Sequence, residues 1–164
     1  MNSDELYMHE ALKEAKKGMW KTSPNPCVGA VIVRNGKEIS RGYHKKAGTP
    51  HAEVHALRKA GERAKNSTIY VTLEPCSHTG RTPPCCQAIV KAGIVRVVVG
   101  MTDPNPLVSG RGIKYLKDHG IEVITGVLEK ECEGINEPFI KHITTGKPLV
   151  TLKAGISLDG KITY

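Results

Sequence analysis

The strongest constraint on the fold is the run of residues 94–99, which is apolar almost throughout and lies between Gly93 and Gly100. A strand that is apolar on both faces has to be covered on both faces, which is typical of a central strand in an α/β sheet. Residues 69–73 are expected to form another strand. These runs predict a sheet that is buried between helices.

The remaining elements follow from local patterns. Asn35-Gly36 separates two strand-like runs, 28–33 and 37–44, and both positions of such a turn favour a positive φ, so we expect an antiparallel hairpin. Further elements are expected as helices over 4–17, 52–65, 84–92, 110–118 and 129–143, and as a strand over 121–124. Helices that alternate with strands after a hairpin predict an α/β fold with three α/β/α layers around a five-stranded mixed sheet.

Residues 146–164 do not continue this pattern. The stretch 145–148, Thr-Gly-Lys-Pro, resembles a linker, residues 149–154 alternate like a strand, and residues 157–160 form a turn. A lone strand cannot bury its own face, so it either adds to an existing sheet edge or begins a second domain. We therefore expect one domain over 1–145 and a separate segment over 146–164.

The composition limits the class of partner. A formal net charge of +8 favours nucleic acid or another phosphate-bearing partner. Aromatic residues make up only 4% of the chain, which is few for a protein that stacks bases on aromatic side chains. No apolar run approaches the ~20 residues of a membrane span, and residues 1–20 are too charged for a signal peptide. The odd number of cysteines, five, then predicts a reducing, cytoplasmic location.

Three side chains have the spacing and chemistry of a metal site. His51 begins an expected helix, Cys76 follows an expected strand, and Cys85 lies in the first turn of the next helix. One imidazole and two thiolates suit Zn²⁺ and leave a fourth position for water, which is the catalytic rather than the structural arrangement. Glu53 is too close to His51 for both to bind one ion, and it suits proton transfer beside the metal-bound water.

Other interpretations of these residues exist. Alone, His51 and Glu53 would be a capping histidine and a first-turn acid, but the two Pro-Cys pairs favour the metal site. A metalloprotease pair of His51 and His55 is rejected because Ala52, not a glutamate, follows His51. No Cys-x-x-Cys redox pair exists. A structural zinc module remains open, and its fourth ligand would be one of Cys86, His78 and His44.

At this point the motifs resemble a known family. His51-Ala52-Glu53 with Pro75-Cys76 is similar to the signature of the cytidine-deaminase-like zinc deaminases, H-x-E…P-C-x-x-C. Here eight residues instead of two separate Cys76 from Cys85, and this longer loop resembles that of the riboflavin-biosynthesis pyrimidine deaminases. Further matches are 25–29 and 103–106, and 148–161 resembles the opening strand and turn of the reductase domain that is fused to this deaminase in bacteria.

The resemblance implies an activity and a set of site residues. The reaction would be zinc-dependent hydrolytic deamination of 2,5-diamino-6-ribosylamino-4(3H)-pyrimidinone 5′-phosphate to 5-amino-6-ribosylaminouracil 5′-phosphate and ammonia. Glu53 would be the catalytic acid and base, and His51, Cys76 and Cys85 would bind one Zn²⁺ per chain. Substrate contacts would come from Asn25, His44, Ala52 and His78 around the pyrimidine and from Arg81, Asp103 and Asn105 on the ribosyl phosphate side.

The resemblance also implies partners. The substrate is a small phosphorylated pyrimidine, and no nucleic acid, membrane or NADP is expected on residues 1–164. A homo-oligomer is possible for this family, and residues 146–164 would be the linker and first strand of a truncated reductase domain. The alternative function is a nucleobase deaminase acting on tRNA or free nucleosides with the same zinc site. The long loop between Cys76 and Cys85 and the scarcity of aromatic residues argue against it.

Overall fold

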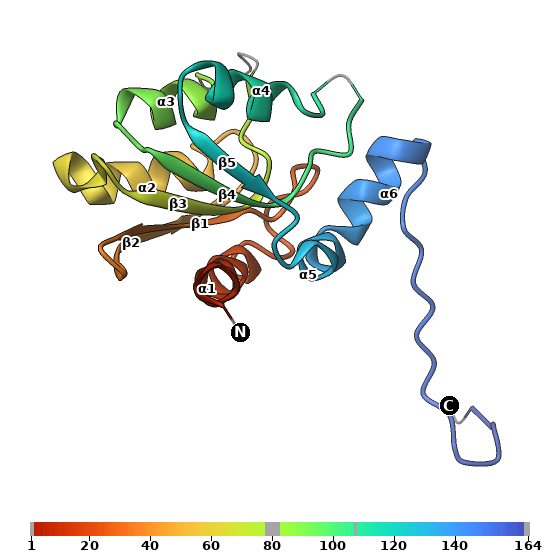
Figure 1. Ribbon diagram of the computed structural model, residues 1–164. Coiled ribbons are helices and arrows are strands. Elements are labelled where there is room, and N and C mark those ends of the chain that lie inside the picture. The colour runs from red at the N-terminus through yellow and green to blue at the C-terminus, as the bar shows by residue number, and fades with distance from the viewer. Residues whose placement is uncertain (1, 78–82, 107, 163–164) are drawn as a thin grey trace.

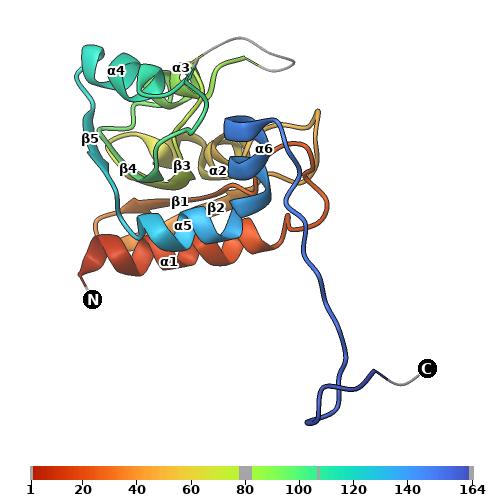
Figure 2. The same cartoon turned by 90° about the vertical axis from the view of Figure 1, so that its right-hand side faces the viewer.

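The computed structural model describes residues 2–77, 83–106 and 108–162. Its strands form one mixed sheet, with α1 and α5 on one face and α2, α3 and α4 on the other (Figures 1 and 2). The elements are α1 Ser3–Lys16, β1 Gly29–Arg34, β2 Lys37–Tyr43, α2 Ala52–Ala60, the 3₁₀ helix η1 Gly61–Ala64, β3 Thr68–Leu73, α3 Cys85–Lys91, β4 Arg96–Met101, α4 Arg111–Asp118, β5 Glu122–Thr125, α5 Glu129–Ile135 and α6 Glu137–Thr145. The predicted α/β fold with three layers and five strands is confirmed.

The order of the strands is β2-β1-β3-β4-β5. β1 pairs antiparallel with β2 and with β3, whereas β3–β4 and β4–β5 are parallel pairs. Asn35 and Gly36 both have positive φ, 52° and 69°, as the predicted hairpin turn requires. The carboxyl ends of β3 and β4 therefore lie at the same edge of the sheet.

The core lies on both faces of the central strands. Every residue of β4 after Arg96 is buried, and so is every residue of β3 after Thr68. The prediction that Gly100 bounds the strand is wrong, because β4 continues to Met101. A Cβ at Gly100 would lie 2.3 Å from the Sγ of Cys132 on α5, so the glycine lets a helix approach the strand closely.

Two predicted helices differ from the observed ones. The helix expected over 52–65 ends at Ala60, and residues 61–64 continue as the 3₁₀ helix η1. The helix expected over 129–143 is broken at Asn136, whose φ of −115° is not helical. The side chain of Asn136 bonds to the backbone of Cys27 instead, so a tertiary contact overrides the local helical pattern. The other boundaries differ by one or two residues.

The strand expected over 149–154 is not formed in this structure. Residues 149–154 have no regular structure, and Val150 and Leu152 are 83% and 93% exposed. The segment runs away from the sheet (Figures 1 and 2), so it does not add to a sheet edge, and no strand in the described residues offers it partners. The turn over 157–160 is present, with the Gly160 N–H donating to Ser157 O at 2.9 Å.

Among the described residues, no helix is both long enough and apolar enough to cross a membrane.

The packing of α1 on β1 generates a prediction about Gly29. A Cβ at Gly29 would lie 2.0 Å from the Ala11 carbonyl oxygen and 2.5 Å from the Ala15 nitrogen, both in the backbone of α1. Gly29→Ala must push helix and strand apart, and we expect it to lower the free energy of unfolding by about 3 kcal/mol in urea titrations.

Gly134 in α5 is the matched control, because a Cβ there meets nothing within 4 Å. Gly134→Ala should raise the free energy of unfolding by up to about 1 kcal/mol, since alanine has the higher helix propensity. Equal unfolding midpoints for the two variants would contradict the proposed close packing of α1 on β1.

Candidate active site and metal centre

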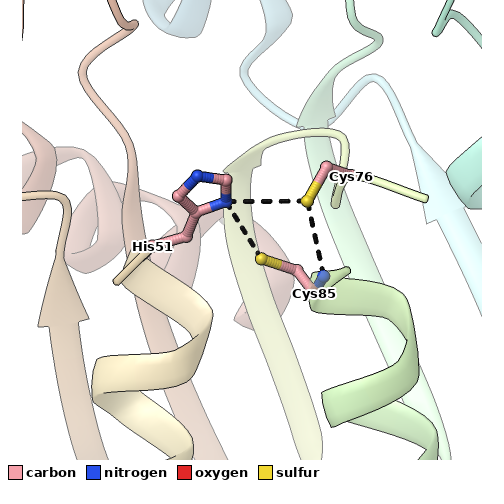
Figure 3. A group of neighbouring side chains, drawn as sticks. All are labelled: His51, Cys76 and Cys85. Atoms are coloured by element: carbon pink, nitrogen blue, oxygen red, sulfur yellow. Dashed lines mark hydrogen bonds between the residues drawn. The ribbon is translucent and has the colours of Figure 1, made fainter. Parts of the chain in front are cut away.

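Three predicted metal ligands meet at one edge of the sheet. His51 precedes α2, Cys76 follows β3, and Cys85 is the first residue of α3 (Figure 3). His51 Nδ1 lies 3.1 Å from Cys85 Sγ and 3.6 Å from Cys76 Sγ. The Nδ1 or Nε2 atom of His51 and the two Sγ atoms lie within 4.8 Å of one another, so these three described residues could hold a metal ion.

The donor set fits Zn²⁺. Tetrahedral zinc with bonds of about 2.0–2.3 Å to nitrogen and sulfur keeps neighbouring ligand atoms about 3.5–3.8 Å apart, close to the separations here. A hydrogen bond from the Cys85 thiol, with help from His51, lowers the pKa of Cys76 to about 4. The pKa of Cys85 is raised because its thiol donates to Cys76 and is buried. The proton between the two sulfurs therefore belongs to the Cys85 thiol, and Zn²⁺ binding to both sulfurs would displace it.

Glu53 is the second residue of α2, and its side chain is buried, with only 3% exposed. Its Oε2 atom is buried and has no hydrogen-bond partner among the described residues. Burial raises the pKa of Glu53, although the nearby His51 opposes the shift. An unpartnered carboxylate oxygen in a buried place beside metal ligands is the arrangement that proton transfer at a bound substrate needs.

A cavity of about 490 Å³ brings most of the predicted site together. This volume is in the range of pockets that enclose small-molecule ligands. Its walls include the predicted residues Asn25, His44, His51, Glu53, Cys76, Asp103 and Asn105. Cys85 and Ala52 are both buried and do not line the cavity. His78 and Arg81 lie outside the described residues.

A hydrogen-bond chain orients His44 and Asn25. Burial lowers the pKa of His44, so its ring is neutral at physiological pH. His44 Nδ1 lies 3.3 Å from Pro50 O, and Nε2 lies 3.1 Å from the side-chain amide nitrogen of Asn25. Because a carbonyl can only accept, the ring carries its proton on Nδ1 and accepts from Asn25 at Nε2. The His44 ring also stands edge-on to the His51 ring, with centroids 5.4 Å apart.

The structure also bears on the fourth-ligand alternatives. Cys86 is turned away from the ligand group, because its Sγ donates to Pro75 O at 3.1 Å. His44 is engaged by Asn25 and Pro50. Two of the three candidates for a closed structural zinc site are therefore occupied elsewhere, and the third, His78, is not described.

Phe139 and Ile143 were missed by the sequence reasoning. Both lie on α6, an element that carries none of the predicted metal ligands, and both line the cavity. Asn136 sets this helix in place, since it accepts from the Cys27 N–H at 2.7 Å and donates to Cys27 O at 3.0 Å. A helical pattern over this region was visible in the sequence, but nothing local indicated that it reaches the site.

Known proteins resemble this chain at two levels, that of a family and that of individual longer proteins. Residues 1–101 match the family described as the cytidine and deoxycytidylate deaminase zinc-binding region. The riboflavin biosynthesis protein RibD of Escherichia coli (strain K12) is 57% identical over 158 residues, which are 96% of this chain and 43% of that protein.

Two solved structures extend the comparison. A diaminohydroxyphosphoribosylaminopyrimidine deaminase/5-amino-6-(5-phosphoribosylamino)uracil reductase from Thermotoga maritima is 46% identical with a TM-score of 0.92, over 97% of this chain and 46% of that one. A C-terminal deletion mutant of Rib2 deaminase from Aspergillus oryzae, in complex with DARIPP, is 25% identical with a TM-score of 0.69, over 87% of this chain and 94% of that one. The chain thus spans less than half the length of these bacterial relatives.

The adjacent Cys85 and Cys86 allow a sharp test of the ligand set. Cys85→Ala removes one of three ligands and should weaken Zn²⁺ binding at least about 100-fold in competition with a chelator. Cys86→Ala should leave the zinc affinity unchanged and lower only the stability, because Cys86 bonds to Pro75 rather than facing the ligand group. A loss of zinc in Cys86→Ala, or its retention in Cys85→Ala, would refute this assignment.

Proposed function

The chain belongs to the cytidine and deoxycytidylate deaminase zinc-binding family, and from this premise we propose that it deaminates a phosphorylated diaminopyrimidinone in riboflavin biosynthesis. The substrate is 2,5-diamino-6-ribosylamino-4(3H)-pyrimidinone 5′-phosphate, whose amino group at ring position 2 is replaced by oxygen. The observation that carries the proposal is that the ligand group and the buried Glu53, whose Oε2 atom has no partner among the described residues, converge on one cavity. The similarity to RibD of E. coli supports the choice of substrate.

The residues of the chain divide the work. His51, Cys76 and Cys85 would hold one Zn²⁺, which when bound supplies Lewis-acid polarisation and lowers the pKa of a water molecule to about 7. Glu53 would take a proton from the attacking water and give it to the ring nitrogen as the water oxygen bonds to carbon 2. It would then take the proton of the new hydroxyl group and give it to the amino group, so that the C–N bond breaks, ammonia leaves and the C=O bond forms. Its raised pKa suits this exchange, because a carboxyl group that both takes and gives a proton works best near neutral pH.

The cavity walls bind and orient the substrate. The Asn25 side chain and His44 would face the pyrimidine, and Asp103 and Asn105 would take the ribosyl side. A contact from the backbone of Ala52, which does not line the cavity, is assigned by family resemblance alone. His78 and Arg81, which lie outside the described residues, are assigned to the pyrimidine and the phosphate by family resemblance alone. Phe139 and Ile143 supply an apolar wall that keeps bulk water away from the reacting carbon.

The domain division forms part of the proposal. Residues 1–145 are the deaminase unit, and residues 146–164 are a linker and a segment that would become the first strand of a reductase domain once paired with the rest of that domain in cis. The exposure of residues 150–162 and the greater length of the bacterial relatives support this division. NADP would bind to the reductase domain and not to residues 1–164. The enzyme would work in the cytoplasm, and self-association is open to measurement.

Glu53→Gln tests the catalytic assignment. The amide keeps the shape of the side chain but cannot move protons, so we expect kcat for ammonia release from the diaminopyrimidinone phosphate to fall about 10²–10⁴-fold. Zinc content should remain at one per chain. Glu14→Gln is the control, since Glu14 is equally buried but lies on α1 away from the cavity and should leave kcat unchanged.

The same assay decides between substrate classes. Ammonia release from the pyrimidine phosphate, without inosine formation in tRNA or deamination of free nucleosides, is the expected result. The reverse pattern, or full activity in Glu53→Gln with zinc retained, would overturn the proposed function.

Truncation tests the domain division. A chain ending at Lys147 keeps Gly146, whose N–H caps α6 by donating to His142 O at 2.8 Å. We expect zinc content to be unchanged and kcat/KM to stay within about twofold of the value for the longer chain. The reason is that residues 149–162 form no strand and add nothing to the sheet. A large loss of either quantity would show that the tail belongs to the deaminase unit.

A further inference from the structure

The carboxylate of Glu74 is unusually rich in backbone partners. It lies directly after β3 and is only 4% exposed. Oε1 accepts from the N–H groups of Gly112 at 2.9 Å and Ile113 at 3.3 Å. Oε2 accepts from the N–H groups of Asp103 at 3.2 Å and Gly110 at 3.0 Å. Both oxygens are thus engaged by one segment that is distant in sequence.

These four donors stabilise a charge that burial would otherwise penalise. Among the residues that the structure describes, no basic side chain forms an ion pair with Glu74. Three of the four amides belong to the N-terminus of α4, where the helix dipole also favours an anion, and the fourth is that of Asp103. Gly110 is the N-cap of α4 and has no side chain to satisfy the free amides. Glu74 supplies that cap from another element.

Close packing reinforces the link. A Cβ at Gly112 would lie 2.0 Å from Pro75 O, so the first turn of α4 sits directly against the residue before Cys76. The same Pro75 O accepts from the Cys86 thiol of α3 at 3.1 Å. The segment 74–76, which carries a metal ligand, is therefore joined to both α3 and α4.

The position of the Glu74 partners relates this link to the cavity. Asp103 and Asn105 lie between β4 and α4, and both line the cavity that His51 also lines. The N–H of Asp103 is held by Glu74, and the Asp103 side chain in turn accepts from the Asn105 N–H at 2.9 Å. Movement of the Glu74 carboxylate would therefore shift this wall relative to the metal ligands.

We propose that Glu74 is a positioning residue that holds Asp103 and Gly110, in the loop between β4 and α4, against the metal-ligand segment and so fixes the width of the substrate site. The inference rests on the proposed function, in which this loop takes the ribosyl side of the substrate. Glu74 itself does not transfer protons, because both of its oxygens are committed to backbone donors. Its loss therefore affects substrate binding more than the chemical step.

Glu74→Gln is the direct test. The side-chain amide nitrogen would face two N–H donors instead of accepting from them, so the loop loses half of its anchor. We expect KM for the diaminopyrimidinone phosphate to rise at least about tenfold while kcat stays within about threefold. Zinc content should be unchanged, and Glu14→Gln, a substitution of a buried glutamate on α1, should change neither constant.

A double variant separates positioning from a general loss of structure. If Glu74 acts through the loop, Asn105→Ala and Glu74→Gln should be non-additive in KM, since both remove the same wall. Fully additive effects, an unchanged KM, a fall in kcat alone or a loss of zinc would each overturn the proposal. Should Glu74→Gln fail to fold, Glu74→Asp, which retains both oxygens on a shorter side chain, must still raise KM.

Amide hydrogen exchange makes the result independent of the proposed function. In Glu74→Gln, the amides of Asp103, Gly110 and Gly112 should exchange at least about tenfold faster, and those of β4 should not. Unchanged exchange at these amides overturns the positioning role. A wild-type chain that releases no ammonia from the pyrimidine phosphate refutes the proposed function alone, since the exchange experiment still reports on Glu74.

Discussion

The parallel pairing of β3 with β4 is the constraint on which the rest of the site depends. Leu73 and Met101 are partners at the carboxyl ends of these strands, and the Glu74 N–H donates to Met101 O just beyond them. The segment with Cys76 and the loop with Asp103 must therefore leave the sheet side by side. Open α/β sheets bind ligands at this edge for the same reason. A slip of the β3–β4 register would separate the metal ligands from the opposite cavity wall.

Two buried glutamates near this edge have opposite surroundings. Four backbone amides satisfy Glu74, whereas Glu53 keeps one oxygen without a partner among the described groups. A satisfied buried carboxylate stabilises one arrangement of the backbone, and an unsatisfied one is costly unless it meets a ligand or takes a proton. The difference in hydrogen bonding thus separates a residue that holds the site from one that is available for chemistry.

Much of the architecture was predictable, because it follows from local patterns. The Asn35-Gly36 turn, the apolar central strands and the order of helices and strands are confirmed. Two of the errors come from contacts between distant segments. Met101 pairs with Leu73 and so continues β4 past Gly100, and the bonds of Asn136 to Cys27 accompany the break in the expected helix. The expected strand over 149–154 lacks the neighbour that any strand needs.

The sequence by itself determined the chemical types at the site, since a histidine, two cysteines and a glutamate at this spacing suit few ions and few roles. It also determined that these residues begin helices or follow a strand. Only the tertiary structure decided what surrounds them. Phe139 and Ile143 line the cavity because Asn136, just before them on the chain, bonds to Cys27, a residue 109 positions away. Glu74 accepts hydrogen bonds from residues up to 39 positions away. Such contacts depend on how the layers pack, which local periodicity does not encode.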